Sequence, residues 1–324
     1  MSIALRLNMT GMQAEPKDEA LRYRAAIDMA AYAEQVGFDF INLEEHHCAN
    51  NGWLPSPLIM AGMITARTER IRIGITALLV TLYDPIRLAE DIAILDLASN
   101  GRLTFVAGMG YRPDEYHAMD KSWQQRGKLM DEVVATLLAA WTGEPFEYKG
   151  KTLRVTPVPV SRPHPFFFIG GMSAAAARRA ARFNLPFYPP MPRPDLDAIY
   201  YEELAKTGGE GFVYTPNAGN CMTFVDDDPE SAWQELCPYL LNEMQEYASW
   251  KQDGIKRPSE DDVTSVEEVR ASGRFEIITK AECVERMQDK NCTVVIHPLA
   301  GGIPLDRAWQ LFKNFTDGVL PLLA

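Results

Sequence analysis

The chain has 324 residues, of which 47% are hydrophobic, enough for one large α/β domain or two ordinary ones. Its 32 Lys and Arg stand against 44 Asp and Glu, a formal net charge of −12, and no basic run is present. This balance argues against binding to nucleic acid or to an anionic membrane. The start of the chain lacks the apolar core and cleavage site of a signal peptide, and the five Cys show no CxxC spacing. We therefore expect a reduced, cytoplasmic protein without a zinc ribbon.

Short apolar strands alternate with longer amphipathic segments along the chain. Eight strands are predicted over residues 3–7, 38–43, 71–77, 103–107, 166–169, 185–188, 222–225 and 293–296. A helical segment follows each strand, including those over 17–36, near 122–142 and over 173–183, and those that begin at Pro57 and Pro85. Eight β-then-α units without a dinucleotide fingerprint favour a closed parallel (β/α)8 TIM barrel over an open doubly wound sheet. No linker divides the chain, so residues 1–324 are expected to form a single domain.

Two irregular stretches interrupt this alternation. Residues 143–165 contain Gly and several Pro, and they are expected to form an inserted hairpin. Residues 251–275 are charged and show little apolar periodicity. A loop of that length in a compact domain is usually a lid or a disordered segment, and we predict a mobile lid here.

Two acids and two His follow the predicted strand 38–43 directly. Buried Glu and His are costly unless paired, so this strand end is expected to open into a polar cavity. Neighbouring residues of an extended chain point to opposite sides, so His46 and His47 are not expected to share a metal ion. Imidazole titrates near neutral pH, which favours a general acid/base or a hydrogen-bond donor to a bound ring. An ordinary solvated loop is the alternative.

Small residues mark the ends of two further strands. Strand 71–77 ends in Thr76 and Ala77, which would let a flat ligand lie against the backbone, although a plain core strand explains them equally well. The segment from Gly108 to Arg112 lacks the third Gly of a dinucleotide fingerprint, and Pro113 interrupts where the helix should run. The segment suits a loop over a barrel mouth, with Arg112 as a candidate anion contact.

A predicted anion site follows strand 166–169. Gly170, Gly171 and Met172 precede Ser173, which can cap the Ala-rich helix that follows. The free amides and positive end of a helix attract a phosphate, and glycines allow its close approach. The alternative is a capped helix after a tight turn.

These motifs, in this order, resemble the bacterial luciferase-like family of flavin-dependent monooxygenases over essentially the whole chain. The resemblance is carried by residues 37–39, 45–47, 70–74, 84–91, 101–103, 108–113 and 163–173. The family fold is the (β/α)8 barrel already favoured. The resemblance implies a two-component monooxygenase that takes reduced FMN from a separate NAD(P)H-dependent flavin reductase. With O2, it would oxygenate a small organic substrate. A homodimer is expected from the family.

The resemblance also implies roles for individual residues. His46 matches the catalytic acid/base, while Asn8 and His47 are assigned to the substrate side. The family often has a non-prolyl cis peptide or bulge under the flavin ring, at the position of Thr76 and Ala77 here. The cofactor-binding residues are then Thr76, Ala77, Gly108, Arg112, Gly170, Gly171, Met172 and Ser173. The family lid corresponds to residues 251–275.

Two departures from the family pattern leave alternatives open. Many members carry Arg at the position of Met109, so either Arg112 takes its place at the phosphate or the phosphate is held more weakly. The light-emitting members have a reactive Cys where this chain has Gly108, so luminescence is not implied. A deazaflavin-dependent oxidoreductase of the same superfamily is the second interpretation, and a flavin-binding protein without turnover is the third.

Overall fold

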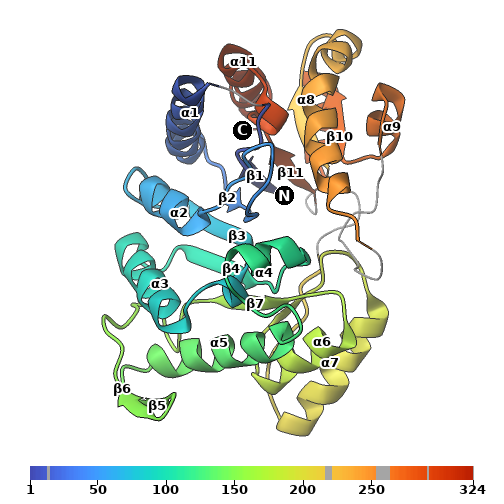
Figure 1. Cartoon of the computed structure of the whole chain (residues 1–324). Coiled ribbons are helices and arrows are strands. Elements are labelled where there is room, and N and C mark those ends of the chain that lie inside the picture. Colours follow the sequence, from blue (N-terminus) through green and yellow to red (C-terminus); the bar gives the residue numbers. More distant parts are fainter. Residues whose placement is uncertain (13–14, 216–220, 253–262, 290–291, 324) are drawn as a thin grey trace. The chain divides into compact units, whose positions relative to one another are not determined.

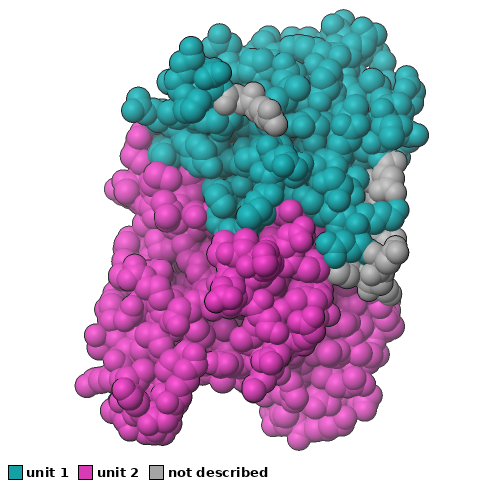
Figure 2. Space-filling view, viewed as in Figure 1, with its two compact units in different colours: residues 1–55, 217–324 teal, residues 56–216 magenta. Residues whose placement is uncertain are grey.

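The protein is described from a computed structural model, which covers all residues except 13–14, 216–220, 253–262, 290–291 and 324. The chain divides into two compact units (Figure 2), with residues 1–55 and 217–324 in unit 1 and residues 56–216 in unit 2. Both units alternate parallel strands with helices, as the sequence predicts (Figure 1). Among the described residues, no helix is long and apolar enough to cross a membrane.

Unit 1 contains five parallel strands in the order β10-β9-β11-β1-β2. The strands are β1 (Ser2–Leu7), β2 (Phe40–Leu43), β9 (Met222–Val225), β10 (Phe275–Ile278) and β11 (Thr293–Ile296). The helices are α1 (Pro16–Gln35), α8 (Pro229–Ser249), α9 (Val266–Ala271), α10 (Lys280–Met287) and α11 (Leu305–Thr316), with 3-10 turns at Ala300–Gly302 and Leu320–Leu322. Residues 3–7 of β1 are all buried, as expected for a parallel strand that is covered on both faces. Leu5 pairs with Ile41 on one side and with Ile296 on the other.

Unit 2 contains four parallel strands in the order β3-β4-β7-β8 and an antiparallel hairpin. The strands are β3 (Arg72–Leu78), β4 (Leu103–Ala107), β7 (Phe167–Gly170) and β8 (Phe187–Tyr188), and the hairpin is β5 (Phe146–Tyr148) with β6 (Lys151–Leu153). The helices are α2 (Pro57–Thr65), α3 (Pro85–Ser99), α4 (Pro113–Ala118), α5 (Arg126–Ala140), α6 (Ala174–Arg182) and α7 (Pro194–Thr207), with a 3-10 turn at Val80–Leu82. The hairpin confirms the insertion predicted over residues 143–165.

Proline begins six of these helices. Pro lacks the N–H that the first turn of a helix leaves without an intrahelical partner, and its fixed φ suits that turn. At α3 the side chain of Asp84 also accepts hydrogen bonds from the amides of Ile86 and Arg87, which confirms the predicted cap. Pro113 was expected to interrupt a helix, and this was wrong. It occupies the first turn of the short helix α4.

All eight predicted strands are present, and their ends lie within two residues of the predicted ends. Strand β10 is an additional strand that was not predicted from the sequence. Of the predicted lid at 251–275, residues 253–262 lie outside the described residues. Residues 266–271 form helix α9, which begins with a capping box between Ser265 and Glu268. The role of this segment as a lid stays a prediction.

Candidate functional site

The predicted site residues are divided between the two units. Asn8, His46 and His47 belong to unit 1, and the remaining eight, from Thr76 to Ser173, belong to unit 2. In both units they lie at or after the carboxyl ends of parallel strands, where α/β folds place their ligand sites.

In unit 1, main-chain hydrogen bonds join the segments that follow β1 and β2. The amide of Leu54 donates to the carbonyl oxygen of Asn8 at 2.8 Å, and the amide of His46 donates to the carbonyl oxygen of Leu54 at 3.2 Å. The amide of Gly11 donates to the carbonyl oxygen of Asn51 at 2.7 Å. Asn8 and His46 are therefore neighbours in this part of unit 1, linked through the single residue Leu54.

The imidazole of His46 is enclosed by three aromatic side chains. Its ring centroid lies 5.1 Å from that of Trp53, 4.5 Å from that of Trp250 and 6.4 Å from that of Tyr247. His46 is only 8% exposed. Trp250 is held in turn, because its Nε1 donates to Glu246 Oε1 at 3.2 Å. The structure thus places a group that can carry a proton in an apolar enclosure with little access to water.

His47 has different surroundings from His46. Its Nε2 lies 3.0 Å from Oε1 of Glu45, a carboxylate whose side chain is fully buried. The His47 side chain itself is 12% exposed. The carboxylate orients the His47 ring, whereas aromatic packing orients the His46 ring, so the two adjacent imidazoles are not equivalent.

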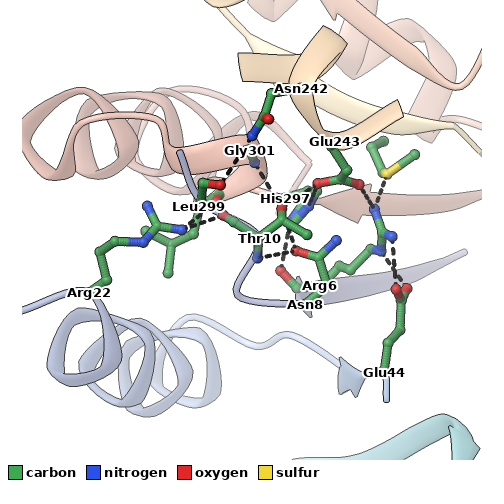
Figure 3. Close-up of polar contacts among 12 residues, drawn as sticks. Arg6, Asn8, Thr10, Arg22, Glu44, Asn242, Glu243, His297, Leu299 and Gly301 are labelled. Carbon is green, nitrogen blue, oxygen red and sulfur yellow. Dashed lines mark hydrogen bonds and ion pairs between the residues drawn. The ribbon is translucent and has the colours of Figure 1, made fainter. Parts of the chain in front are cut away.

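A buried charge cluster in unit 1 was not predicted from the sequence (Figure 3). Arg6 on β1 donates Nε and Nη2 to the two carboxylate oxygens of Glu44, at 2.6 and 2.9 Å. Its Nη1 donates to Glu243 Oε1 on α8 at 3.0 Å and also contacts the sulfur of Met222. Arg6 thus bridges two carboxylates that come from distant parts of the chain.

His297 completes this charge cluster. Its Nδ1 lies 3.0 Å from the carbonyl oxygen of Arg6, and its Nε2 lies 3.1 Å from Glu243 Oε2. The imidazole therefore lies between a main-chain carbonyl oxygen and a carboxylate oxygen, and both of these are acceptors when Glu243 is ionised. Burial opposes the ionisation of Glu243, but Arg6 and His297 outweigh it and hold the pKa of this carboxyl well below its ordinary value. Arg6 and His297 therefore contact the carboxylates of this cluster in the interior.

In unit 2, the peptide bond between Thr76 and Ala77 is cis, which confirms the backbone feature that the family resemblance implied. The register between β3 and β4 also shifts between Thr76 and Leu78. Gly108 packs closely here, since a Cβ at this position would lie 2.9 Å from the Cβ of Ala77. Only glycine lets the segment after β4 approach Ala77 without displacement.

Arg112 is buried and paired. Its Nη1 donates to Glu115 Oε1 at 3.2 Å, and both side chains are nearly inaccessible to solvent. Nearby, the hydroxyl of Tyr116 donates to the carbonyl oxygen of Met109 at 2.6 Å. Burial raises the pKa of Tyr116 to about 12. Because Glu115 offsets part of its charge, Arg112 is a weaker candidate for a phosphate contact than the sequence alone implied.

The segment from Gly170 to Ser173 leads from β7 into the first turn of α6. Ser173 caps α6, with its Oγ accepting from the amide of Ala176 at 3.2 Å. The other amides at the start of a helix have no partner within the helix. A Cβ at Gly170 would lie 2.6 Å from Val106, and one at Gly171 would lie 2.6 Å from Ala176. Both glycines are therefore required for the tight path of the chain into α6.

Comparison with known proteins decides the family. Residues 6–292 match the family described as luciferase-like monooxygenase. The chain belongs to the luciferase-like monooxygenase family. The predicted fold class, an α/β TIM barrel of the luciferase-like type, is confirmed with it.

Curated relatives are about a quarter to a third identical to the chain over the stretches that align. An uncharacterized protein of Sinorhizobium fredii is 30% identical, covering 49% of this chain and 47% of that protein. The alkanal monooxygenase beta chain of Vibrio harveyi is 25% identical, covering 49% and 51%. The FMNH2-dependent dimethylsulfone monooxygenase of Pseudomonas putida is 27% identical, covering 48% and 46%. The chain thus spans about half the length of these curated relatives.

Solved structures of luciferase-like proteins match the whole chain in fold. Monooxygenase RslO1 from Streptomyces bottropensis superposes with a TM-score of 0.69 at 22% identity, covering 100% of both chains. The oxygenating constituent of 3,6-diketocamphane monooxygenase from Pseudomonas putida, in complex with FMN, gives 0.68 at 17% identity, covering 100% and 99%. An F420-dependent secondary alcohol dehydrogenase gives 0.66 at 15% identity, covering 100% and 99%. At these identities the likeness shows the fold alone.

Proposed function

We propose that this protein is the oxygenase component of a two-component monooxygenase. It takes reduced FMN from a separate NAD(P)H-dependent flavin reductase and uses O2 to oxygenate a small organic substrate. The observation that carries the proposal is His46, a titratable imidazole enclosed by three aromatic rings after β2. The relatives named as an alkanal monooxygenase and an FMNH2-dependent dimethylsulfone monooxygenase support the reaction class and the cofactor.

The residues of unit 2 fit a flavin nucleotide. The first-turn amides of α6, capped by Ser173 and reached through Gly170 and Gly171, suit its phosphate. The small residues Thr76 and Ala77 suit one face of its ring. When bound, reduced FMN would supply the electrons that activate O2.

In this proposal His46 gives or takes a proton at an imidazole nitrogen. Trp53, Tyr247 and Trp250 hold its ring and exclude water, so that the proton goes to the reacting group rather than to solvent. Asn8 and His47 contact the substrate.

The test begins with binding. The full-length protein is titrated with FMN, reduced FMN and deazaflavin, and the oxidation of the bound reduced cofactor by O2 is then followed. We expect reduced FMN to bind best and His46→Gln to lower turnover by about 10²- to 10⁴-fold with little loss of affinity. His164→Gln in unit 2, where Nδ1 of the imidazole lies 2.8 Å from the carbonyl oxygen of Pro165, is the matched control. A fully active His46→Gln variant would refute the proposed role of His46.

A deazaflavin-dependent oxidoreductase is the second candidate. The fold match to a protein named as an F420-dependent secondary alcohol dehydrogenase supports it, and this candidate would transfer a hydride without O2. Tight binding of deazaflavin together with weak binding of reduced FMN would select it. Binding of a flavin with no reaction would select the third candidate, a flavin-binding protein without turnover.

We also propose that the protein is a homodimer. In unit 2, α2 and α3 carry four exposed apolar side chains at helical spacing, namely Ile59, Met63, Ile94 and Leu97. Clusters of this kind mark protein interfaces more often than free surface. Light scattering should give twice the mass of the chain, and Ile59→Glu with Ile94→Glu should give monomers.

A further inference from the structure

Asn8 carries a buried hydrogen-bond donor that has no acceptor among the described residues. The residue has no exposed surface, and its Nδ2 is unpaired. Its Oδ1, in contrast, accepts from the amide of Thr10 at 3.2 Å (Figure 3). A flipped carboxamide would set two donors against each other, so this bond fixes which end of the side chain is the oxygen. Buried donors are rarely left unpaired in folded proteins, which makes Nδ2 an exception that calls for a ligand.

Thr10 is itself held by three different neighbours. Its carbonyl oxygen accepts from Arg22 Nη2 at 2.6 Å, and its Oγ1 accepts from the amide of Gly301 at 2.9 Å. The Thr10 hydroxyl has one hydrogen and lies 2.7 Å from Glu243 Oε2 and 3.0 Å from Asn8 Oδ1. An ionised carboxylate is the stronger acceptor, so the hydroxyl donates to Glu243. The amide of Thr10 is then what orients Asn8.

A second unpaired donor lies in the same part of unit 1. Trp53 is 3% exposed, and its Nε1 has no acceptor among the described residues. Trp53 immediately precedes Leu54, whose amide donates to the carbonyl of Asn8. Both unpaired atoms, Asn8 Nδ2 and Trp53 Nε1, can only donate, so a ligand that satisfies them must present acceptors.

We propose that Asn8 Nδ2 is a preset donor to an acceptor oxygen of the bound ligand, and that Thr10, anchored by Glu243, is its positioning residue. The inference rests on the proposed function, and it limits the ligand to molecules that present an acceptor oxygen to Asn8. The oxygen belongs to a carbonyl, carboxylate or sulfonyl group of the substrate, or to a carbonyl of the flavin ring. A site built to donate a hydrogen bond discriminates against analogues that lack the acceptor.

The side-chain amide signals of Asn8 test this directly. In the 15N-labelled full chain they are assigned by their loss in Asn8→Ser and are followed during titration with FMN, with decanal, and with decane as the matched hydrocarbon. A downfield shift with FMN identifies the flavin as the source of the oxygen, and a shift with decanal identifies the substrate. Signals that stay fixed with all three probes, or that respond equally to decane and decanal, overturn the proposal. FMN binding, measured by fluorescence in the same samples, reports separately on the proposed function.

The positioning role of Thr10 has its own matched pair. Thr10→Val keeps the shape of the side chain but removes the hydroxyl bonds to Glu243 and to the amide of Gly301, and Thr10→Ser keeps the hydroxyl. We expect Thr10→Val to weaken binding of the responding probe by about 10-fold and to reduce the Asn8 shift, and Thr10→Ser to restore both. A merely structural role would lower the unfolding temperature without changing the Asn8 shift. A shift in Thr10→Val equal to that of the unmodified chain would refute the positioning role.

Discussion

The buried charge cluster of unit 1 allows a quantitative prediction for Glu243→Gln. The change keeps the size of the side chain and one acceptor oxygen for Thr10, but it removes a charge that Arg6 and His297 share. Removing one partner of a buried ion pair costs about 3–5 kcal/mol, because the other charge stays buried and unpaired.

The structure places the expected loss at the lower end of that range, about 3 kcal/mol of unfolding free energy. Arg6 cannot lose its proton, but it keeps its two bonds to Glu44, whose side chain is 17% exposed. These two bonds limit the cost without removing it.

Urea unfolding of the full chain, followed by circular dichroism, measures this loss. Glu230→Gln is the matched control, since Glu230 lies on the same helix and its ion pair with Arg270 is exposed. We expect the control to leave the midpoint unchanged. A loss of less than about 1 kcal/mol in Glu243→Gln, the value of a surface pair, would contradict the reasoning.

The pH dependence of the same variant has a defined sign. The pKa of Glu243 is lower in the folded than in the unfolded chain, so its stabilisation is complete above the unfolded value of about 4.3. The stabilisation is lost as the pH falls through the lower, folded pKa. The difference in stability between the unmodified chain and Glu243→Gln should therefore shrink as the pH falls below about 4.3. A difference that grows as the pH falls below about 4.3 would refute the assignment.

Three further predictions concern unit 2. Gly108→Ala should destabilise the protein by about 1–3 kcal/mol in thermal unfolding, because its Cβ would meet Ala77, whereas Gly62→Ala on α2 has room and should be neutral or stabilising. Ser173→Ala should cost about 1 kcal/mol in urea unfolding through loss of the α6 cap, and it should also weaken FMN binding. Tyr116→Phe should reduce the ultraviolet titration step near pH 12.

Local patterns explain what the sequence predicts well. Apolar runs such as 222–225 and 293–296 match β9 and β11 residue for residue, and Asp84 before Pro85 marks the start of α3. These signals depend on neighbouring residues alone. Strand β10 was missed because its four residues follow a charged stretch, although Phe275 and Ile277 alternate as a half-buried strand should.

In the candidate site, too, local sequence patterns predict some residues, and contacts between distant parts of the chain supply the others. His46 is visible in the sequence because two acids and two His follow a strand, and Gly171 and Ser173 are visible because they precede an Ala-rich helix. The ion pair between Arg112 and Glu115 could also have been predicted, because the two residues are three positions apart at the start of a short helix. The three aromatic rings around His46 were not predictable, because Tyr247 and Trp250 come from the end of α8.

Arg6 is the clearest example of a residue whose partners cannot be predicted from the sequence. It is the one charged residue of β1, in which residues 3–7 are otherwise apolar, and a buried guanidinium must have partners. Its side chain contacts Glu44 after β2 and Glu243 on α8, and its carbonyl oxygen contacts His297 after β11. The spacing of these residues in the sequence does not predict the contacts. The charge of Arg6 holds Glu243 ionised, Glu243 holds Thr10, and Thr10 orients Asn8. Arg6, a strand residue that belongs to no sequence motif, therefore helps to orient Asn8 Nδ2, the donor that we propose for the ligand.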